Sequence, residues 1–294
     1  MCYTCASLNH KEALVTHEPL RLRPMGVGDL LDTAFRLYRR HFLLFVGIVS
    51  VIYVPLTLVR TVLEGAFLFT EVELVSMSSI GFYFVTQLAL LVMTFLAVQG
   101  LMNAAMARAV ADSYLGRPRG LVDTFRALGW RWLRLVGALI LLGLLDVFIF
   151  LLFLIPCVGW IAGLIFLIYV NVPISSFLAP VVVVEGQGAA GSLGRAFDLG
   201  RRKFWRVLGI NLLLVLLGVA IWWALFALLA LVSSVWQSDS VILTIFYQLV
   251  ALVVTVMVMP VWLSTLTLLY FDLRIRLEGF DLELMLQEMD VERA

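Results

Sequence analysis

Residues 207–232 read VLGINLLLVLLGVAIWWALFALLALV, a stretch without a charged side chain and with Asn211 as its one carboxamide. A helix rises about 1.5 Å per residue, so roughly 20 apolar residues cross the hydrocarbon core of a bilayer, which is about 30 Å thick. Backbone groups in lipid have no water to bond with, and only a helix bonds them all within one segment. We therefore expect a membrane-spanning helix over about 205–233.

The composition extends this expectation to the whole chain. Of its 294 residues, 63% are hydrophobic and 14% are charged, and the mean hydropathy is +1.04. A soluble domain is typically about 45–50% apolar and about 25% charged. These values argue against a soluble enzyme, a disordered chain and a nucleic-acid-binding protein, and three cysteines are too few for a disulfide framework. We predict an all-α, polytopic membrane helical bundle.

Five further stretches have the length and composition of a span. The six predicted transmembrane helices lie at about 42–59, 80–107, 133–155, 160–184, 205–233 and 241–271. The polar residues 1–24 precede them and are expected to be disordered, and the membrane domain covers 25–272. Over 273–294, apolar residues at helical spacing alternate with acids, which predicts an amphipathic cytoplasmic helix at the C-terminus.

The arginines predict the orientation of the chain. Six spans bring both termini and the loops at about 108–132 and 185–204 to one side, which then holds 20 of the 21 basic residues. Only Arg60 falls in a predicted outer segment. Because cytoplasmic loops carry an excess of Lys and Arg, both termini are predicted to be cytoplasmic.

The chain also contains an internal repeat. Residues 31–48 (LDTAFRLYRRHFLLFVGI) align without gaps with 121–138 (LVDTFRALGWRWLRLVGA) and with 193–210 (LGRAFDLGRRKFWRVLGI). Three columns are identical in all copies, namely Leu31/Leu121/Leu193, Phe35/Phe125/Phe197 and Gly47/Gly137/Gly209. We predict three repeats, at about 26–112, 116–185 and 188–272, each an amphipathic interfacial helix followed by a two-span hairpin.

Each repeat opens with an arginine-rich amphipathic stretch. In the first, an apolar face that includes Leu30, Ala34 and Phe35 is backed by arginines, and Asp29 is a candidate N-cap. This pattern fits either a helix in the inner interface beside anionic headgroups, or an ordinary cytoplasmic helix whose arginines set the topology. The predicted headgroup-binding residues are Arg36, Arg39, Arg40, Arg126, Arg131, Arg134, Arg201, Arg202, Lys203 and Arg206.

Asp146 is the most unusual residue, because it lies near the middle of the third predicted span, in GLLDVFIF. An aspartate at the centre of a membrane helix costs about 2.5–3.5 kcal/mol on insertion scales, so it is by default a functional hypothesis. In one interpretation, Asp146 relays a proton or faces a polar cavity. In the other, it is a protonated carboxyl that bonds to a neighbouring helix.

Polar residues and prolines interrupt two further spans. Asn171 and Pro173 lie in the fourth span and Pro260 lies in the sixth, and the two prolines each precede a carboxylate, Glu185 or Asp272, by 12 residues. Broken helices at corresponding places can mark a substrate site in transporters. Ordinary proline kinks are the alternative.

Metal binding and catalysis have little support in the sequence. Cys2 and Cys5 with His10 and His17 superficially resemble a zinc site, but the loop between the pairs is shorter than such sites usually have. All three histidines precede the first span, and the GxSxG, Walker and HExxH motifs are missing. We expect no metal, no cofactor and no enzymatic activity.

Three motifs together resemble a bacterial family. They are GDLLDTAFRLYRRHF at 28–42, PVVVVEG at 180–186 with SLGRAFDL at 192–199, and LYFDLRIRLEGFDLEL at 269–284. They are similar to the glycerophosphoryl diester phosphodiesterase membrane-domain family, over nearly the whole chain. The resemblance implies a stand-alone membrane module, because the His-Arg-Gly and Glu-Asn-Thr motifs of the catalytic barrel found in fused members are missing here.

The expected function is that of a non-catalytic integral protein of the bacterial inner membrane, acting in envelope or lipid-related processes. Its expected partners are membrane lipid or another protein, and no nucleic acid. The alternative is a small-molecule transporter or permease that uses the Asp146 region and the proline-broken fourth and sixth spans.

Overall fold

The computed structural model describes residues 25–69, 77–117, 119–236 and 241–279. These residues are helical apart from short connections, and no strand occurs among them, which confirms the predicted all-α class. The N-terminal segment 1–24 and most of the predicted C-terminal helix over 273–294 lie outside the described residues.

A short helix, α1 (Val27–Arg40), precedes the first two long helical segments. These are α2 (Phe42–Phe69) and a second segment formed by α3 (Met77–Thr94), the π-helical η1 (Phe95–Met102) and α4 (Asn103–Tyr114). The N-cap of α1 is Gly26 and not, as predicted, Asp29. The Gly26 N–H donates to Asp29 Oδ2 at 3.2 Å, so the aspartate caps the helix from its third position, as a capping-box acid does.

The same order of elements occurs twice more along the chain. The next group holds α5 (Leu121–Leu128), α6 (Arg131–Leu152), α7 (Val158–Phe166), the π-helical η2 (Leu167–Asn171), α8 (Val172–Pro180) and the π-helical η3 (Val181–Glu185). The last group holds α9 (Ala189–Arg201), α10 (Phe204–Trp236) and α11 (Val241–Glu278). A short helix therefore stands before each pair of long segments.

Six helical segments of the described chain are long and apolar enough to cross a membrane, as predicted. They are Phe42–Leu63, Gly81–Tyr114, Arg131–Leu152, Val158–Glu185, Phe204–Leu231 and Ile245–Glu278. Helix α11 has 38 residues, so its length is about 57 Å, well beyond a hydrocarbon core of about 30 Å. The longest helices thus continue past the bilayer, which is why several ends differ from the predicted ones.

The core forms where α11 packs against α1, α2 and α4. Phe45, Met106, Tyr270 and Phe271 are fully buried there. Helix α1 contributes Leu30, Thr33, Ala34 and Leu37 as its buried face, whereas Phe35, predicted on the apolar face, is exposed. The first amphipathic stretch is therefore a helix packed on the bundle, with Arg36, Arg39 and Arg40 on its exposed side.

Two glycines of the repeated column allow close helix contacts. A Cβ added to Gly47 would lie 2.7 Å from Leu121 Cδ1, and one added to Gly137 would lie 3.4 Å from Ala189 Cβ. Leu121 and Ala189 are the first residues of α5 and α9, so α2 and α6 each meet the start of the next short helix. A Cβ on Gly209, the third member, would meet nothing within 4 Å.

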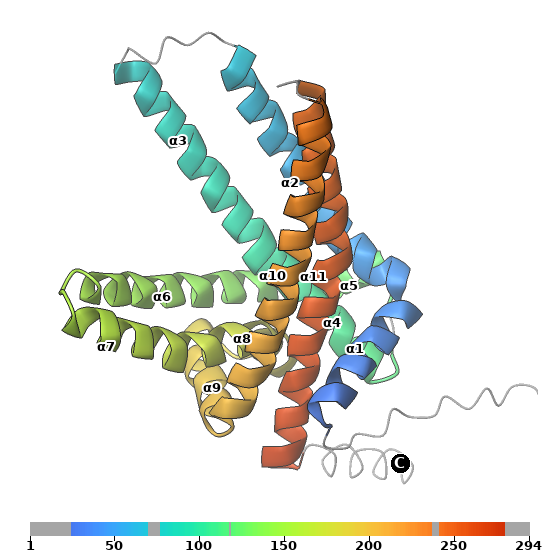
Figure 1. Ribbon diagram of the computed structural model, residues 1–294. Helices are drawn as coiled ribbons and strands as arrows, with labels where there is room; N and C mark the ends of the chain where they lie inside the picture. Colours follow the sequence, from blue (N-terminus) through green and yellow to red (C-terminus); the bar gives the residue numbers. More distant parts are fainter. Residues whose placement is uncertain (1–24, 70–76, 118, 237–240, 280–294) are drawn as a thin grey trace, which may run out of the picture.

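The hairpin of α6 and α7 differs in direction from the other long helices. Figure 1 shows α6 and α7 running across the direction of α10 and α11 rather than alongside them. Apolar side chains around the far end of this hairpin are exposed, including Leu144, Phe150, Leu154, Val158 and Ile161. The hydrocarbon of a membrane covers such a surface without a large hydrophobic penalty.

Candidate functional site

Most of the predicted headgroup-binding residues have exposed side chains. They are Arg36, Arg39 and Arg40 on α1, Arg126 on α5, Arg134 on α6, and Arg201, Arg202 and Lys203 at the end of α9. Arg36 pairs with Asp32 at 3.4 Å and Arg201 with Asp198 at 2.8 Å, in both cases on the surface. Exposed pairs of this kind contribute little stability, so these arginines remain accessible to an anionic ligand.

Two tryptophans lie beside these basic residues. Trp130 directly precedes α6 and Trp205 is the second residue of α10, and each is 81% exposed. Tryptophan is enriched at membrane–water interfaces, where its ring meets the headgroup region. The surface formed by Arg201, Arg202, Lys203 and Trp205, here called the α9–α10 junction, thus combines positive charge with an interfacial aromatic ring.

Arg131 and Arg134 have partners inside the protein. Arg131 Nη1 donates to the Val183 carbonyl and Arg134 Nη1 to the Gly186 carbonyl, each at 2.9 Å. Both acceptors lie at the C-terminal end of η3, where helix carbonyls lack partners and carry partial negative charge. These two arginines tie α6 to the end of the following long segment.

Arg206 is not a surface residue of the kind predicted. Its Nε donates to Asp272 Oδ2 at 3.0 Å, and its side chain is only 21% exposed. Asp272 is fully buried and also accepts hydrogen bonds from Arg276 Nε at 3.0 Å. We correct the prediction for Arg206, because a guanidinium that neutralises a buried carboxylate is not available to a lipid phosphate.

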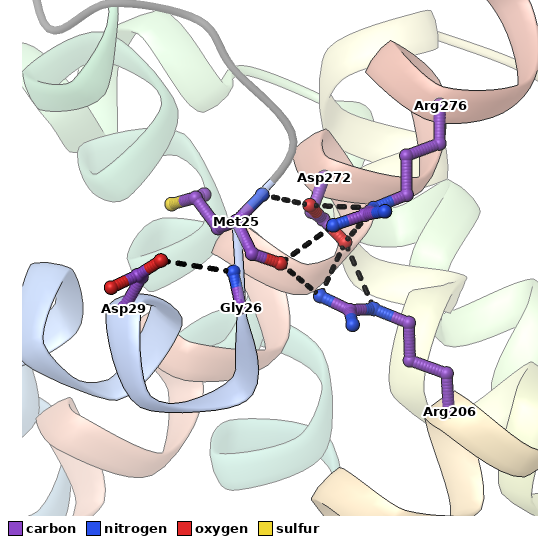
Figure 2. Close-up of polar contacts among 6 residues, drawn as sticks. All are labelled: Met25, Gly26, Asp29, Arg206, Asp272 and Arg276. Carbon is purple, nitrogen blue, oxygen red and sulfur yellow. Dashed lines mark hydrogen bonds and ion pairs between the residues drawn. The ribbon is translucent and has the colours of Figure 1, made fainter.

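The same cluster holds the beginning of α1. Figure 2 shows Met25 between the two arginines and Asp272. The Met25 N–H donates to Asp272 Oδ1 at 2.8 Å, and its carbonyl accepts from Arg206 and Arg276, each at 2.6 Å. Asp272, Arg206, Arg276 and Met25 form the Asp272 cluster, which links the starts of α1 and α10 to the end of α11.

Glu185 ends the fourth span in a similar way. Arg195 Nε donates to Glu185 Oε2 at 3.1 Å, and the Tyr270 hydroxyl donates to Glu185 Oε1 at 2.8 Å. Arg195 also pairs with Glu278 at 2.5 Å. Burial by itself lowers the pKa of Arg195, but its bonds to Glu185 and Glu278 outweigh this and raise the pKa above the ordinary value.

Asp112 lies near the end of the second predicted span, as Glu185 and Asp272 lie near the ends of the fourth and the sixth. Its Oδ2 accepts from Arg108 at 3.1 Å and from Arg119 at 3.3 Å. The acids that follow Pro173 and Pro260 by 12 residues therefore each bind arginine, as does Asp112. The spacing from the two prolines pointed to Glu185 and Asp272, but it did not indicate which arginines pair with these acids.

Asp146 and Asn171 lie together, between α6 and the end of η2. The Asn171 side-chain amide donates to Asp146 Oδ1. Neither residue lines the cavity of about 570 Å³ that lies between α8, α10 and α11. The bond to a neighbouring helix matches the structural interpretation of Asp146 and gives no support to a place for it in a transport path.

A cavity with a volume of about 570 Å³ lies among α2, η1, α4, α8, α10 and α11. Its polar lining consists of Tyr53, Gln99, Asn103, Ser175, Ser176, Asn211, Thr255 and Thr267. Most of the remaining lining is apolar, with Trp222 and Trp262 as the largest side chains. The sequence analysis missed this cavity, although Ser175 and Ser176 are close to Pro173.

The prolines themselves do not line this cavity, and the two spans are not broken at them. Helix α11 continues through Pro260, and Pro173 lies in the first turn of α8, directly after η2. Their neighbours Ser175 and Met259 do reach the cavity. This geometry fits the alternative of ordinary proline kinks, because the chain stays helical at both prolines: a helix tolerates proline in its first turn and bends at one in its interior.

No group of three His, Cys, Asp or Glu side chains that could hold a metal ion occurs within the described part of the chain. The Cys2, Cys5, His10 and His17 set lies outside the described residues.

Searches against protein-family models, curated proteins and solved structures find no match to this chain. The resemblance to the glycerophosphoryl diester phosphodiesterase membrane-domain family therefore stays a hypothesis that rests on the motifs themselves.

Proposed function

We propose that the protein is a non-catalytic, multi-pass protein of the bacterial inner membrane whose basic cytoplasmic surface binds anionic lipid headgroups. The observation that carries this proposal is the α9–α10 junction, where three exposed basic side chains stand directly beside a tryptophan that is 81% exposed. A basic residue close to an anionic leaflet contributes about 1 kcal/mol of attraction.

The position of this junction along the chain supports headgroup binding. Residues 201–203 form a turn between α9 and α10, and the apolar span Phe204–Leu231 begins directly after it. Basic and aromatic residues at the end of a span occupy the headgroup layer when the span crosses the bilayer. Among the predicted headgroup residues, those of the junction are therefore the ones best placed to contact lipid phosphates.

The arrangement of elements supports the proposed threefold repeat. In each third of the chain a short helix precedes two long segments, and the repeated glycines Gly47 and Gly137 face the start of the next short helix. The threefold repeat, the cytoplasmic termini and the family resemblance all belong to this proposal. The resemblance implies a membrane module in envelope or lipid-related processes, with a further protein as a possible partner.

The test measures lipid binding by the purified protein in nanodiscs that contain either phosphatidylcholine or phosphatidylglycerol. The ratio of the two affinities is its preference for phosphatidylglycerol. Replacing Arg201, Arg202 and Lys203 together with Gln should reduce the preference for phosphatidylglycerol by about a hundredfold, since three interactions of about 1 kcal/mol are lost. The matched control changes Arg201 and Arg202 to Lys, which keeps the charge and should keep the preference. An unchanged preference in the Gln variant would refute the proposal.

A transporter is the second candidate, and the observation that favours it is the cavity between α8, α10 and α11. This version does not include Asp146, because neither Asp146 nor its partner Asn171 lines the cavity. Substrate flux in proteoliposomes would therefore be unaffected by Asp146→Asn if the cavity is the route. A flux lost in that variant would return Asp146 to the pathway.

A further inference from the structure

The cavity has an uncharged lining. Its polar groups are hydroxyls and carboxamides, and no Asp, Glu, Lys, Arg or His is among the residues that line it. A charged ligand in a membrane cavity needs an opposite charge or dense hydrogen bonding, because an unpaired charge is costly in a medium of low polarity. The lining chemistry therefore favours an uncharged ligand with hydroxyl or amide groups.

Three carboxamides supply hydrogen-bonding groups for such a ligand. Asn103 Nδ2 donates to Gln99 Oε1 at 2.8 Å, and Asn211 Nδ2 donates to Ser176 Oγ and to the Val207 carbonyl, each at 2.9 Å. These bonds use only part of what a carboxamide offers, which is two N–H donors and an oxygen with two lone pairs. The side chains of Asn103, Asn211 and Gln99 all line the same cavity.

The hydroxyl groups of the cavity wall are used in hydrogen bonds within the protein to a greater extent than the carboxamides are. Ser176 Oγ donates to the Val172 carbonyl at 2.7 Å, and Thr255 and Thr267 donate to carbonyls of their own helix at 2.8 and 2.9 Å. Hydroxyls in a helix commonly bond back in this way. The carboxamides are thus the principal polar contacts available to a ligand.

The cavity is polar at one end and apolar at the other. Asn211 lies seven residues after the start of α10, and Trp222 lies 11 residues further along the same helix, a rise of about 16 Å. The polar end is close to the α9–α10 junction, which we place at the headgroup layer. An amphiphile from that leaflet would enter with its headgroup at Asn211 and its chains toward Trp222.

The cavity is open toward the lipid-facing side of α10. Val215, Val219 and Trp222 line it and are also 46%, 46% and 52% exposed. An opening of the cavity on this side of α10 would give these side chains such exposure. A ligand can therefore reach the carboxamides from the hydrocarbon without passing through water.

Three π-helical segments contribute to the elements at the polar end or adjoin them. Segment η1 contributes Gln99 and Met102, and α8, with Ser175 and Ser176, lies between η2 and η3. Short π-helical stretches inside α-helices occur frequently at functional sites, where the wider turn redirects side chains. The position of the π-helical segments is an observation independent of the lining chemistry, and it also indicates the polar end of the cavity as a functional site.

The geometry points to a binding site for one uncharged membrane lipid with a hydroxyl-bearing headgroup, of the diacylglycerol class. The headgroup hydroxyl bonds to the carboxamides of Asn103 and Asn211, and the acyl chains leave the cavity past Trp222 into the bilayer. A volume of about 570 Å³ accommodates the headgroup and the first part of the chains. Typical small-molecule sites measure about 300–1,000 Å³. This site uses other residues than the proposed anionic-lipid surface and goes beyond it.

The test uses the full chain in phosphatidylcholine nanodiscs with a diazirine-bearing dioleoylglycerol, which crosslinks on illumination. Mass spectrometry should locate the label on α10 and α11 residues of the cavity wall. Unlabelled dioleoylglycerol should displace the probe, whereas phosphatidylglycerol and hexadecane should not. Equal displacement by phosphatidylglycerol would overturn the uncharged specificity, and equal displacement by hexadecane would overturn the role of the polar groups.

Variants separate binding from folding. Asn103→Leu and Asn211→Leu should each weaken retention of the probe about tenfold, the effect of one lost hydrogen bond. The matched control is Gln248→Leu, a carboxamide on α11 that bonds to Thr61 and does not line the cavity. An equal loss in this control would contradict the proposal.

Two more variants make every outcome informative. If Asn211→Leu fails to fold in a thermal melt, Ser175→Trp fills the cavity from an exposed wall position and should abolish labelling. Labelling that persists in Ser175→Trp would refute the site. The triple Gln variant of the α9–α10 junction should label normally, so the site and the proposed lipid surface succeed or fail separately.

Discussion

A single carboxylate, Asp272, joins three segments that are far apart in the sequence. It is fully buried, and it accepts hydrogen bonds from Arg206, Arg276 and the Met25 N–H. A buried charge is tolerated only when its partners satisfy it, and the two guanidinium groups and the amide do so here. The cluster therefore stabilises one arrangement of α1, α10 and α11.

Asp272→Asn should destabilise the folded protein by about 3–5 kcal/mol, because it leaves two partly buried guanidinium groups without their counter-charge. Thermal unfolding in detergent measures the loss. The matched control is Asp32→Asn on α1. The Asp32 side chain is 65% exposed, and its ion pair with Arg36 contributes at most about 1 kcal/mol. If the two variants melt alike, the Asp272 cluster does not hold the helices together.

Asp146 illustrates what a residue reveals before its surroundings are known. Its position inside an apolar stretch identified it as exceptional, and the structure gives it Asn171 as a partner. The partner lies 25 residues away on the facing segment of the same hairpin. Sequence spacing alone could not select this pair, because it depends on how the two helices are rotated against each other.

Among the elements, α9 and α8 form one of the closest contacts of the fold. A Cβ added to Gly200 would lie 2.5 Å from Pro173 Cβ and 3.1 Å from Pro173 Cα. Backbone atoms of α8 occupy that space, so they cannot move aside as a flexible side chain would. Glycine at this position lets two helices approach, as small residues do in membrane proteins.

Gly200→Ala should therefore destabilise the protein by about 1–3 kcal/mol, the usual cost of an added methyl group in a packed contact. The control is Gly194→Ala on the same helix, where the new Cβ meets nothing within 4 Å. That change should be neutral or stabilise by up to about 1 kcal/mol, because alanine favours helix over glycine. Chemical or thermal unfolding of both variants checks the difference, and a stable Gly200→Ala protein would contradict the packing.

Elements differ in how far the sequence predicts them. The spans and the three short helices follow from runs of apolar residues and from the arginine-rich stretches. The π-helical segments η1, η2 and η3 do not, because one extra residue per turn is a response to packing around a helix. Within the predicted apolar face of α1, Leu30 and Ala34 are buried and Phe35 is exposed, a distinction that the helical period does not make.

For the whole molecule, the α6–α7 hairpin decides the topology. Figure 1 shows this hairpin running across α10 and α11, yet its surface is apolar on all sides at its far end. A helix that lies in the interface has a polar face, and this hairpin has none there. We therefore expect the hairpin to cross the hydrocarbon with a strong tilt away from the bilayer normal, and its turn to lie on the side opposite to the termini.

Cys157 tests this topology directly. It is an exposed cysteine in the turn between α6 and α7. With Cys2 and Cys5 changed to Ser, a membrane-impermeant maleimide added to intact cells should label Cys157, and a cytoplasmic marker cysteine at the N-terminus should stay unlabelled. If Cys157 is labelled only after the membrane is permeabilised, the hairpin does not cross, and four spans remain.

The apolar runs and the placement of the arginines alone predict a helical chain with six segments that could cross a membrane, and with basic residues gathered at their ends. Those properties depend on the transfer of side chains from water to hydrocarbon, which is additive along the chain. Only the tertiary structure decided which arginines pair internally, that Asp146 bonds Asn171, and where the cavity with Asn103 and Asn211 lies. These depend on the rotation and approach of helices distant in sequence, which no local pattern records.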